Sequence, residues 1–425
     1  MISLGCAKNL VDSEVLMRQL EANRFRLAFD PTDIRQIDSV VINTCGFIGD
    51  AKQESIDTIL EYALARQQGT ISHLYVMGCL SERYVSTLRK EITEVDEWFG
   101  VNDLKKIITH LGGTYRTQLL GDRYLTTPPH YAYLKIAEGC DRRCSFCAIP
   151  GIRGKHLSRP MEDILMEAGK LAEKGVKEIN VISQDTTYYG LDLYKKRRLP
   201  ELLRQLAAVP GLEWIRVHYA YPDGFPADLM KVIRSHENIC RYIDIPLQHI
   251  SDRILRSMRR GLGGTSTRRL VEKIRKEIPG VAIRTTFIAG YPGETAAEHR
   301  ELMEFIRESR FERVGVFPYS HEEDTHAYTL KDSISARLKE ERTGELMSLQ
   351  EEISHSLNLE KVGTEQKVII DRSEGEFFVG RTEYDSPEVD NEVLIRREKR
   401  DILPGTFARV RITGADSFDL FADLL

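Results

Sequence analysis

Three cysteines lie within eight residues of one another, in the segment EGCDRRCSFCAIP: Cys140, Cys144 and Cys147. Exposed thiolates oxidise readily, so three cysteines at the spacing C-x3-C-x2-C are expected to bind a metal centre. Structural zinc and ferredoxin-type clusters generally have four protein ligands, and neither a second cysteine pair nor a fourth nearby ligand is present. Three thiolates fit a cubane iron–sulfur cluster whose fourth iron stays open to a small chelating ligand, such as the amino and carboxylate groups of a methionine-type cofactor.

A second set of cysteines follows stretches with strand character. Cys6, Cys45 and Cys79 come after MISLG, SVVINT and HLYVMG, and helical patterns separate these stretches. Carboxyl ends of parallel strands meet at one edge of a sheet, where sites form. The alternative is three buried small side chains at strand ends. We interpret the pattern as a second three-thiolate cluster site; the strand before Cys6 is short, which is consistent with a natural start a few residues upstream.

The composition fits a soluble, reducing-compartment protein of several domains. The chain has 425 residues, 41% hydrophobic and 29% charged, with a formal net charge of −5. Seven cysteines, an odd number, argue against a disulfide framework, and we expect Cys240 to be a buried or idle thiol. No apolar run is long enough for a membrane span, and MISLGCAKNLVDSE lacks a secretory leader. We therefore expect a cytoplasmic protein without a membrane partner.

The remaining sequence predicts the elements that position these cysteines. Residues 1–122 predict an α/β domain with a parallel sheet covered by helices on both faces, and TTPPHYAYLK is a linker. Strand-like runs then recur over residues 131–328, separated by helical patterns: 132–139, 178–185, 213–220, 241–248, 282–290 and 313–320. Six such units predict a partial (β/α)6 barrel rather than the full eight. Its site would lie at the strand carboxyl ends, directly where Cys140 follows the first strand.

The last hundred residues predict a helix and a small β-barrel. Residues 329–358 have helical periodicity, and 359–425 contain five short alternating stretches that indicate a five-stranded barrel. This barrel has 15 acidic and 10 basic residues, whereas the first 358 residues balance. An acidic barrel is unsuited to gripping nucleic acid and suits a basic protein, although a solvated acidic surface would give the same count.

The cysteine motif at Cys140 resembles that of radical S-adenosylmethionine (SAM) enzymes. The arrangement of all three parts is similar, over essentially the whole chain, to the radical SAM methylthiotransferases, whose last part is a TRAM domain. Within them, LGCAKNLVDSE, NTCGFIGDAKQESID, GCLSERY, SQDTTYYG and IPLQHISDRILRSMRRG resemble the RimO-type branch, which modifies an aspartate of small-subunit ribosomal protein twelve. The alternative is the MiaB-type branch, which modifies an adenosine of transfer RNA and typically begins GCQMN.

The resemblance implies the cofactors and the reaction. Two four-iron, four-sulfur (4Fe–4S) clusters would be bound, one by Cys140, Cys144 and Cys147, with SAM on its open iron, and an auxiliary one by Cys6, Cys45 and Cys79. A one-electron reductant would drive cleavage of SAM to a radical, and a methylthio group would be added to the aspartyl β-carbon of the ribosomal protein, alone or within the ribosome. Nucleic acid would not be the primary substrate.

Other residues are weaker candidates for the site. By resemblance, GYPGET (290–295) lies near the SAM pocket, although Gly290, Pro292 and Gly293 would equally form a turn and helix cap. Polar residues at strand ends would line the cavity or only cap loops: Gln184, Asp185, Gln248, His249 and Arg284. RSMRRG (256–261) reads as a solvated helix end rather than a substrate contact.

Overall fold

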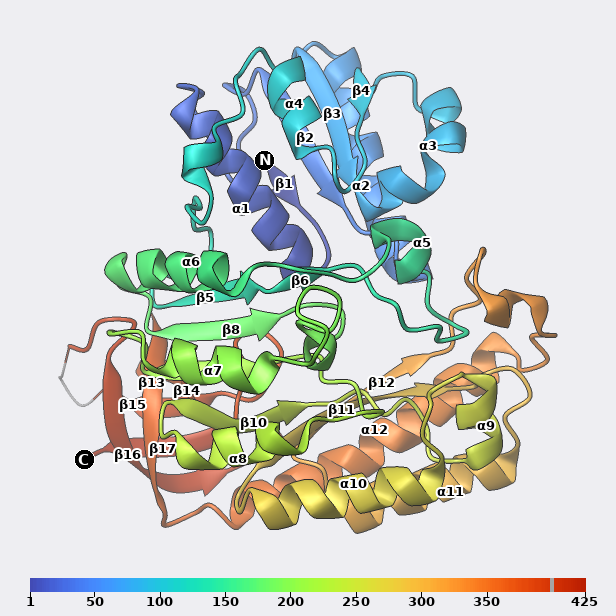
Figure 1. Cartoon of the computed structure of the whole chain (residues 1–425), viewed down its shortest axis with the longest axis vertical. Helices are drawn as coiled ribbons and strands as arrows, with labels where there is room; N and C mark the ends of the chain where they lie inside the picture. The colour runs from blue at the N-terminus through green and yellow to red at the C-terminus, as the bar shows by residue number, and fades with distance from the viewer. Residues whose placement is uncertain (398–400) are drawn as a thin grey trace.

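The computed structural model describes residues 1–397 and 401–425, so residues 398–400 of the predicted barrel lie outside the described residues. An N-terminal α/β unit stands above a six-stranded sheet with a helical layer, and a β-barrel closes the far side (Figure 1). Within the described ranges, no helix combines the length and the apolar character that crossing a membrane requires.

The N-terminal sheet has four parallel strands in the order β1-β2-β3-β4. The strands are β1 (Ile2–Ser3), β2 (Ser39–Thr44), β3 (His73–Gly78) and β4 (Glu97–Trp98), and the helices are α1 (Ala7–Ala22), α2 (Gly49–Gln67), α3 (Cys79–Glu91) and α4 (Leu104–His110), followed by the 3-10 turn η1 (Thr117–Leu119). Alternate residues of β2 face opposite layers, because Val41 packs against α1 and α4 while Val40 packs against α2 and α3. The expected sheet with helices on both faces is confirmed, and β4 is an addition to it.

The middle sheet has six parallel strands in the order β12-β11-β10-β9-β8-β5 and is not closed. These strands are β5 (Tyr131–Lys135), β8 (Glu178–Ile182), β9 (Trp214–Val217), β10 (Ile239–Asp244), β11 (Ala282–Ala289) and β12 (Arg313–Pro318). The outer helices are α6 (Met161–Glu173), α7 (Leu199–Ala207), α8 (Ala227–Ser235), α9 (Asp252–Ser257), α10 (Gly264–Glu277) and α11 (Ala296–Ser309), with 3-10 turns η2 (Thr186–Tyr188) and η3 (His326–Thr329). The partial (β/α)6 barrel predicted from six strand–helix repeats is therefore confirmed. The sequence pattern did not predict a small hairpin of β6 (Ala137–Glu138) and β7 (Leu157–Ser158), nor the short helix α5 (Ile149–Arg153) between its strands.

The last part is a long helix followed by a closed five-stranded barrel, β13-β14-β15-β17-β16. Helix α12 (Ala336–Leu359) begins later than the expected 329, because the Ser335 side chain accepts a hydrogen bond from the backbone N–H of Leu338 and caps it there. The strands are β13 (Glu365–Glu374), β14 (Phe377–Thr382), β15 (Val393–Arg396), β16 (Phe407–Ala415) and β17 (Leu420–Leu424). The predicted small barrel is confirmed.

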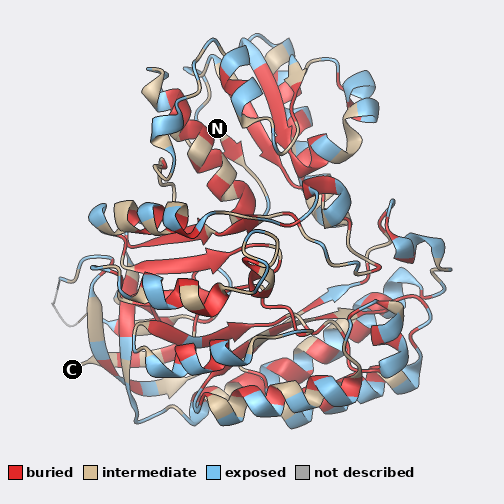
Figure 2. Cartoon of the chain, in the orientation of Figure 1, coloured by how far each residue is buried: buried red, intermediate tan, exposed pale blue. Residues whose placement is uncertain are grey.

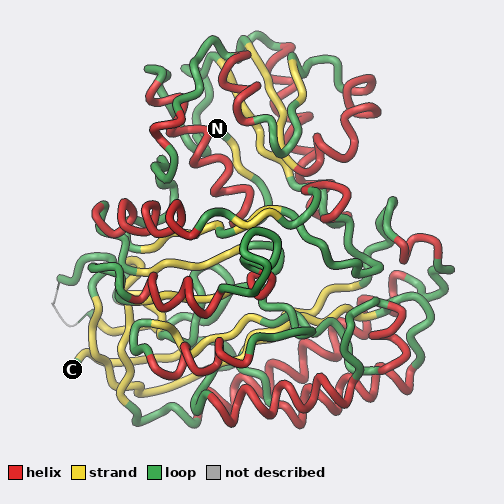
Figure 3. The backbone as a smooth tube through the Cα atoms, in the orientation of Figure 1, coloured by secondary structure: helices red, strands yellow, loops and turns green. Residues whose placement is uncertain are grey.

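The largest apolar core lies between the six-stranded sheet and its outer helices. Figure 2 shows buried residues running along the strands and along the inward faces of the helices, and Figure 3 shows those helices on one side of the sheet. Separate cores fill the N-terminal unit and the interior of the C-terminal barrel. The other face of the six-stranded sheet carries smaller apolar clusters together with buried polar and charged side chains.

The C-terminal barrel packs on that face through an apolar cluster and through buried ion pairs. The Glu178 carboxylate lies 3.0 Å from Arg216 Nε and 2.8 Å from Arg381 Nη2, and all three side chains are almost fully buried. Arg381 also pairs with Asp371, whose carboxylate contacts His130 Nε2 at 2.7 Å. Because several acidic residues of the barrel pair with basic residues of the sheet, the barrel's excess of acidic residues is partly internal and does not measure an exposed acidic surface.

Candidate active site

Cys140, Cys144 and Cys147 lie in the loop between β6 and α5, at the carboxyl end of the first barrel strand. The hairpin of β6 and β7 pins both ends of this loop, and Gly139, with φ of +74°, turns the chain into it. A cavity of about 530 Å³ opens beside the loop. It is lined by all three cysteines and by Asp141, Arg142, Arg143, Pro150, Gly154, Lys155, Arg259 and His326. Four of the five Lys, Arg, Asp or Glu residues in the wall are basic, which suits an anionic cluster and a ligand that carries a carboxylate.

Two side chains from loops at the carboxyl edge of the sheet contact Cys144. Arg260 Nη1 lies 3.3 Å from its sulfur and the Tyr221 hydroxyl lies 3.6 Å from it, while the Arg260 guanidinium also stacks on the Tyr221 ring. Arg260 belongs to RSMRRG, and for this residue the expectation of a solvated helix end is wrong: Arg256 and Arg259 are exposed, but Arg260 is buried. The turn after α9 directs it inward, which a charge pattern does not reveal.

The GYPGET loop contacts the cysteine loop. The Tyr291 hydroxyl lies 2.8 Å from the hydroxyl of Ser145, a residue that lies between Cys144 and Cys147 in the sequence. The Glu294 carboxylate accepts a hydrogen bond from the Gly290 N–H and is paired with Arg342, which shapes the turn. Both interpretations of this segment are therefore compatible with the structure: it forms a turn, and that turn buttresses the loop with the cysteines.

Cys6, Cys45 and Cys79 come together at one edge of the N-terminal sheet. Cys6 precedes the first residue of α1, Cys45 follows β2, and Cys79 opens α3. Asn9 joins the strand ends by donating hydrogen bonds to the carbonyls of Leu4 and Thr44, each at 3.0 Å. Gly5 packs so closely that a Cβ at this position would lie 2.7 Å from the Cβ of Cys45. The strand-end placement inferred from the sequence is therefore what the structure has.

Helix α5 connects the two groups of cysteines. It begins two residues after Cys147 and lies below the N-terminal unit (Figure 1). Ile152 of this helix and Ala148 just before it pack against Cys79. Its last residue, Arg153, is buried and directs Nε to the Cys79 sulfur at 3.4 Å. The same guanidinium pairs with Asp12 at 3.1 Å and with Glu138 at 2.9 Å. Sequence reasoning missed Arg153, because nothing local links a residue after one motif to a cysteine 74 positions earlier.

The chemistry of both triads fits polynuclear iron–sulfur clusters. Burial raises the pKa of Cys79 and of Cys147 to about 12 and that of Cys140 to about 11. Buried thiols of this kind become thiolates when a metal centre compensates their charge. In the described part of the chain no three His, Cys, Asp or Glu side chains converge tightly enough to hold a single metal ion. A cubane does not need that convergence, because each thiolate binds a different iron.

The remaining candidates have identifiable partners. Gln184 donates to Glu138 at 2.7 Å, and Asp185 receives Arg142 Nε of the cysteine loop at 2.8 Å, so both support the loop. Arg284 lies between Asp244 and Asp390, and His249 lies 3.6 Å from Glu294. The structure gives Gln248 a left-handed backbone, with φ of +73°. Cys240 is buried against the C-terminal barrel, as expected.

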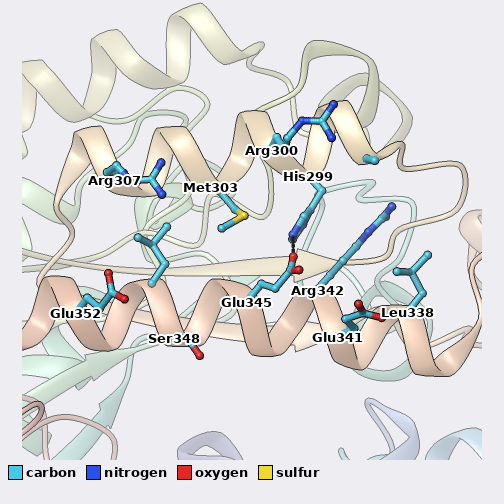
Figure 4. Close-up of a pocket in the computed structure, with 12 residues that line it drawn as sticks. His299, Arg300, Met303, Arg307, Leu338, Glu341, Arg342, Glu345, Ser348 and Glu352 are labelled. Carbon is cyan, nitrogen blue, oxygen red and sulfur yellow. Dashed lines mark hydrogen bonds and ion pairs between the residues drawn. The ribbon is translucent and has the colours of Figure 1, made fainter.

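A second cavity, of about 540 Å³, lies between α11 and α12. Figure 4 shows His299 and Glu345 facing each other across it, with His299 Nε2 and a Glu345 oxygen 2.6 Å apart. None of the six cysteines lines it, since it belongs to the outer helical layer. The cavity beside Cys140 is therefore the one relevant to the proposed chemistry.

Comparison with known families agrees with this geometry. Residues 134–306 match the radical SAM superfamily, residues 362–425 match the TRAM domain, and residues 1–100 match the Uncharacterized protein family UPF0004. The fold resembles the radical S-adenosylmethionine methyltransferase TsrM from Kitasatospora setae, with a TM-score of 0.55 at 14% identity over 82% of this chain and 87% of that chain. The molecule is thus a radical SAM enzyme with an additional N-terminal α/β unit and a TRAM domain.

Curated relatives narrow the class. The chain is 54% identical, over 100% of its length and 98% of the relative, to the ribosomal protein uS12 methylthiotransferase RimO of Phocaeicola vulgatus. It is 55% identical to the protein of the same name from Flavobacterium johnsoniae, over 99% of this chain and 97% of that one. The chain belongs to the RimO family of ribosomal protein uS12 methylthiotransferases, which confirms the resemblance found in its motifs.

Proposed function

We propose that the protein is a radical SAM methylthiotransferase that adds a methylthio group to the β-carbon of an aspartate in ribosomal protein uS12, in the cytoplasm. The observation that carries this proposal is the bridge made by α5: one short helix follows Cys147 and ends in a guanidinium on Cys79. Two cysteine sites with a shared element are what a reaction needs when it makes a radical at one site and supplies sulfur from the other.

The six cysteines would hold two 4Fe–4S clusters, Cys140, Cys144 and Cys147 one and Cys6, Cys45 and Cys79 the other. When bound, these clusters supply the one-electron cleavage of SAM and the sulfur to be transferred, chemistry that side chains alone do not provide for an unactivated C–H bond. The electron comes from an external one-electron reductant.

The protein's own residues position and tune these sites. Arg260 and Tyr221 hold Cys144 from one side, and Arg142 is fixed by Asp185 while its backbone N–H lies 3.4 Å from the Cys140 sulfur. Arg153 gives Cys79 a charged hydrogen-bond donor. Donors of this kind stabilise negative charge on ligand sulfurs, so they favour the reduced form of a cluster. We also propose that the chain is divided into an N-terminal α/β domain (1–122), the partial barrel (131–328), a connecting helix (329–358) and the small β-barrel (359–425).

The test uses anaerobically reconstituted protein with SAM, a reductant and either uS12 or transfer RNA. We expect about eight irons per chain and a uS12 peptide heavier by about 46 Da, the change when S–CH₃ replaces hydrogen. Formation of 5′-deoxyadenosine should accompany the mass gain. About four irons, or a mass gain on transfer RNA instead of uS12, would contradict the proposal.

A further inference from the structure

We propose that Lys8 binds the carboxylate of the target aspartyl side chain and so sets the position of the reacting β-carbon. This inference rests on the proposed function and adds a residue that recognises the substrate. Lys8 lies two positions after Cys6, in the first turn of α1. A carboxylate held by Lys8 would therefore place the adjacent carbon beside the sulfur-supplying triad.

The ammonium group of Lys8 reaches from the N-terminal unit to the six-stranded sheet. Its Nζ lies 3.1 Å from the centroid of the Tyr219 ring, just beyond the carboxyl end of β9. Helix α1 contacts β5 in the same region. The loop bearing Cys140 also leaves the carboxyl edge of this sheet, so the Lys8 amine lies on the same edge as that loop.

Lys8 is buried without a carboxylate partner. Only 8% of the residue is exposed. Carboxylates on the surrounding elements have other partners: Asp12 pairs with Lys135 and Arg153, Asp244 pairs with Arg284 and His218, and Glu388 accepts hydrogen bonds from the hydroxyls of Tyr131 and Tyr133. Among the described residues, no ion pair joins Lys8 to a carboxylate. An aromatic face offsets only part of the cost of desolvating an ammonium ion.

The helix itself increases the demand for an anion. The amino end of α1 carries partial positive charge, its first turn contains no acidic residue, and its N-cap residue, Cys6, makes no side-chain capping bond. A lysine in this first turn adds positive charge where an acidic residue is favoured. The arrangement is unfavourable in the free protein and becomes favourable when an anionic ligand binds.

The platform beneath the amine is also held in an uncommon conformation. Tyr219 has φ of +57°, a left-handed backbone that is strained for a bulky residue, and its N–H donates to Asp244 at 3.0 Å. Strained residues of this kind persist only where the surrounding structure enforces their conformation, and they are concentrated at ligand-binding and active sites. The conformation fixes the ring under Lys8 and keeps the ammonium in place.

The experiment compares Lys8→Met with Lys8→Arg in the reconstituted holoenzyme. Lys105→Met is the matched control, because Lys105 is the second residue of α4 as Lys8 is of α1, but is exposed. The probes are two uS12 loop peptides, one with the target aspartate and one with asparagine in its place. Peptide Kd is measured by fluorescence anisotropy, alongside KM, kcat, bound iron, SAM affinity and 5′-deoxyadenosine formed without peptide.

We expect Lys8→Met to raise Kd and KM for the aspartate peptide at least about 30-fold, because it removes one partner of a buried charge pair. Lys8→Arg keeps the positive charge and should recover most of the loss. The asparagine peptide should bind the wild type and Lys8→Met equally weakly. Bound iron, SAM affinity and peptide-independent SAM cleavage should stay within about twofold, as they should in Lys105→Met.

Equal binding of the aspartate peptide by wild type and Lys8→Met would overturn the inference. So would a loss of iron or of SAM affinity in Lys8→Met, which would assign the lysine to a cluster or to the SAM carboxylate. A wild-type enzyme that cleaves SAM but leaves uS12 unmodified is a different result, since it overturns the proposed function and the inference with it.

Discussion

Cys140, Cys144 and Cys147 are carried by one loop of eight residues, whereas Cys6, Cys45 and Cys79 are brought together from three strand ends. The first triad borders a cavity of about 530 Å³. In the second, Cys45 and Cys79 are buried and only Cys6 is exposed. The loop triad needs little more than its own hairpin, while the strand-end triad exists only when the whole N-terminal sheet is folded.

The difference suits the two chemical roles. A site that binds and releases a diffusible cofactor has to be open, and its ligands have to keep their spacing while other parts move. A site that hands over sulfur benefits from burial, which protects reactive sulfur from solvent and oxidants. We expect perturbations of the N-terminal sheet to remove one cluster and leave the other intact.

The largest effects should come from removing one ligand of each triad. Cys144→Ala is expected to abolish SAM cleavage, whereas Cys79→Ala should retain SAM cleavage and lose methylthio transfer. Because outer partners of metal sites are already worth about 10- to 100-fold in activity, the loss of a ligand should exceed about 100-fold. Iron counts, 5′-deoxyadenosine and peptide mass give the three readouts. Cys240→Ala, a buried thiol outside both triads, is the control; loss of both activities in Cys79→Ala would show that the sites are not separable.

Next in size is a matched pair of glycine changes. Gly78 precedes Cys79 with φ of +101°, and a Cβ there would lie 2.6 Å from the carbonyl oxygen of Thr44. Gly139 precedes Cys140 with φ of +74°, and a Cβ there would collide with the carbonyl of Lys155. Each change to alanine should cost roughly 1–3 kcal/mol from backbone strain alone.

Gly78→Ala should reduce the iron bound by the strand-end triad, and Gly139→Ala that bound by the loop triad. Thermal unfolding and iron analysis of each variant measure both effects. Gly169→Ala, in α6 with open space around it, should be neutral or stabilising. Equal loss of both clusters in both variants would argue against independent assembly.

A smaller effect is expected from Arg153→Lys. The lysine keeps a positive charge near Asp12 and Glu138 but cannot reproduce the Nε donor to Cys79. The reduction potential of the auxiliary cluster should fall, on the order of tens of millivolts, because a donor to sulfur favours the reduced state. Redox titration followed by electron paramagnetic resonance distinguishes the two clusters; an equal shift of both would contradict this role.

The smallest effect concerns the metal-free protein at high pH. Burial raises the pKa of Cys79 and Cys147 from about 9 to about 12 and that of Cys140 to about 11. The neutral thiols therefore contribute stability that is fully present below pH 9 and is lost as the pH rises toward these values.

Denaturant unfolding of the metal-free protein between pH 8 and about pH 11 measures that loss. The reconstituted protein is the control, because its ligands are already thiolates and should not show it. Alkylation at pH 8 should modify exposed Cys6 before buried Cys79. Similar rates at the two positions would mean that the strand-end triad is open in the absence of iron.

Sequence patterns predicted the strands and helices of this molecule better than the contacts between its structural units. Strand-like runs identified all six strands of the middle sheet and the three principal strands of the N-terminal sheet, because period and turn residues are local signals. The strand-end position of Cys6, Cys45 and Cys79 followed from the rule that parallel strands share an edge.

The contacts between units were not predictable in this way. Arg153 reaches Cys79, Lys8 reaches Tyr219, and Arg381 of the barrel reaches Glu178 of the sheet. Each joins positions far apart in the chain through one side chain, and a single charged residue has no period to detect. The net charge of the barrel favoured the RimO-type branch, which is confirmed, but the count could not show which acidic residues are paired with the sheet.

Residues 140–153 contain every ligand of the loop triad and, in Arg153, a hydrogen-bond donor to the other triad. This overlap determines where the chain can be divided when a chimeric enzyme is built. If residues 1–122 were moved onto an unrelated SAM-cleaving scaffold, Cys79 would lose the hydrogen bond from the Arg153 guanidinium. If they were deleted, Arg153 would keep Glu138 but lose its partners Asp12 and Asn9. A working graft would have to carry α5 along with the N-terminal sheet.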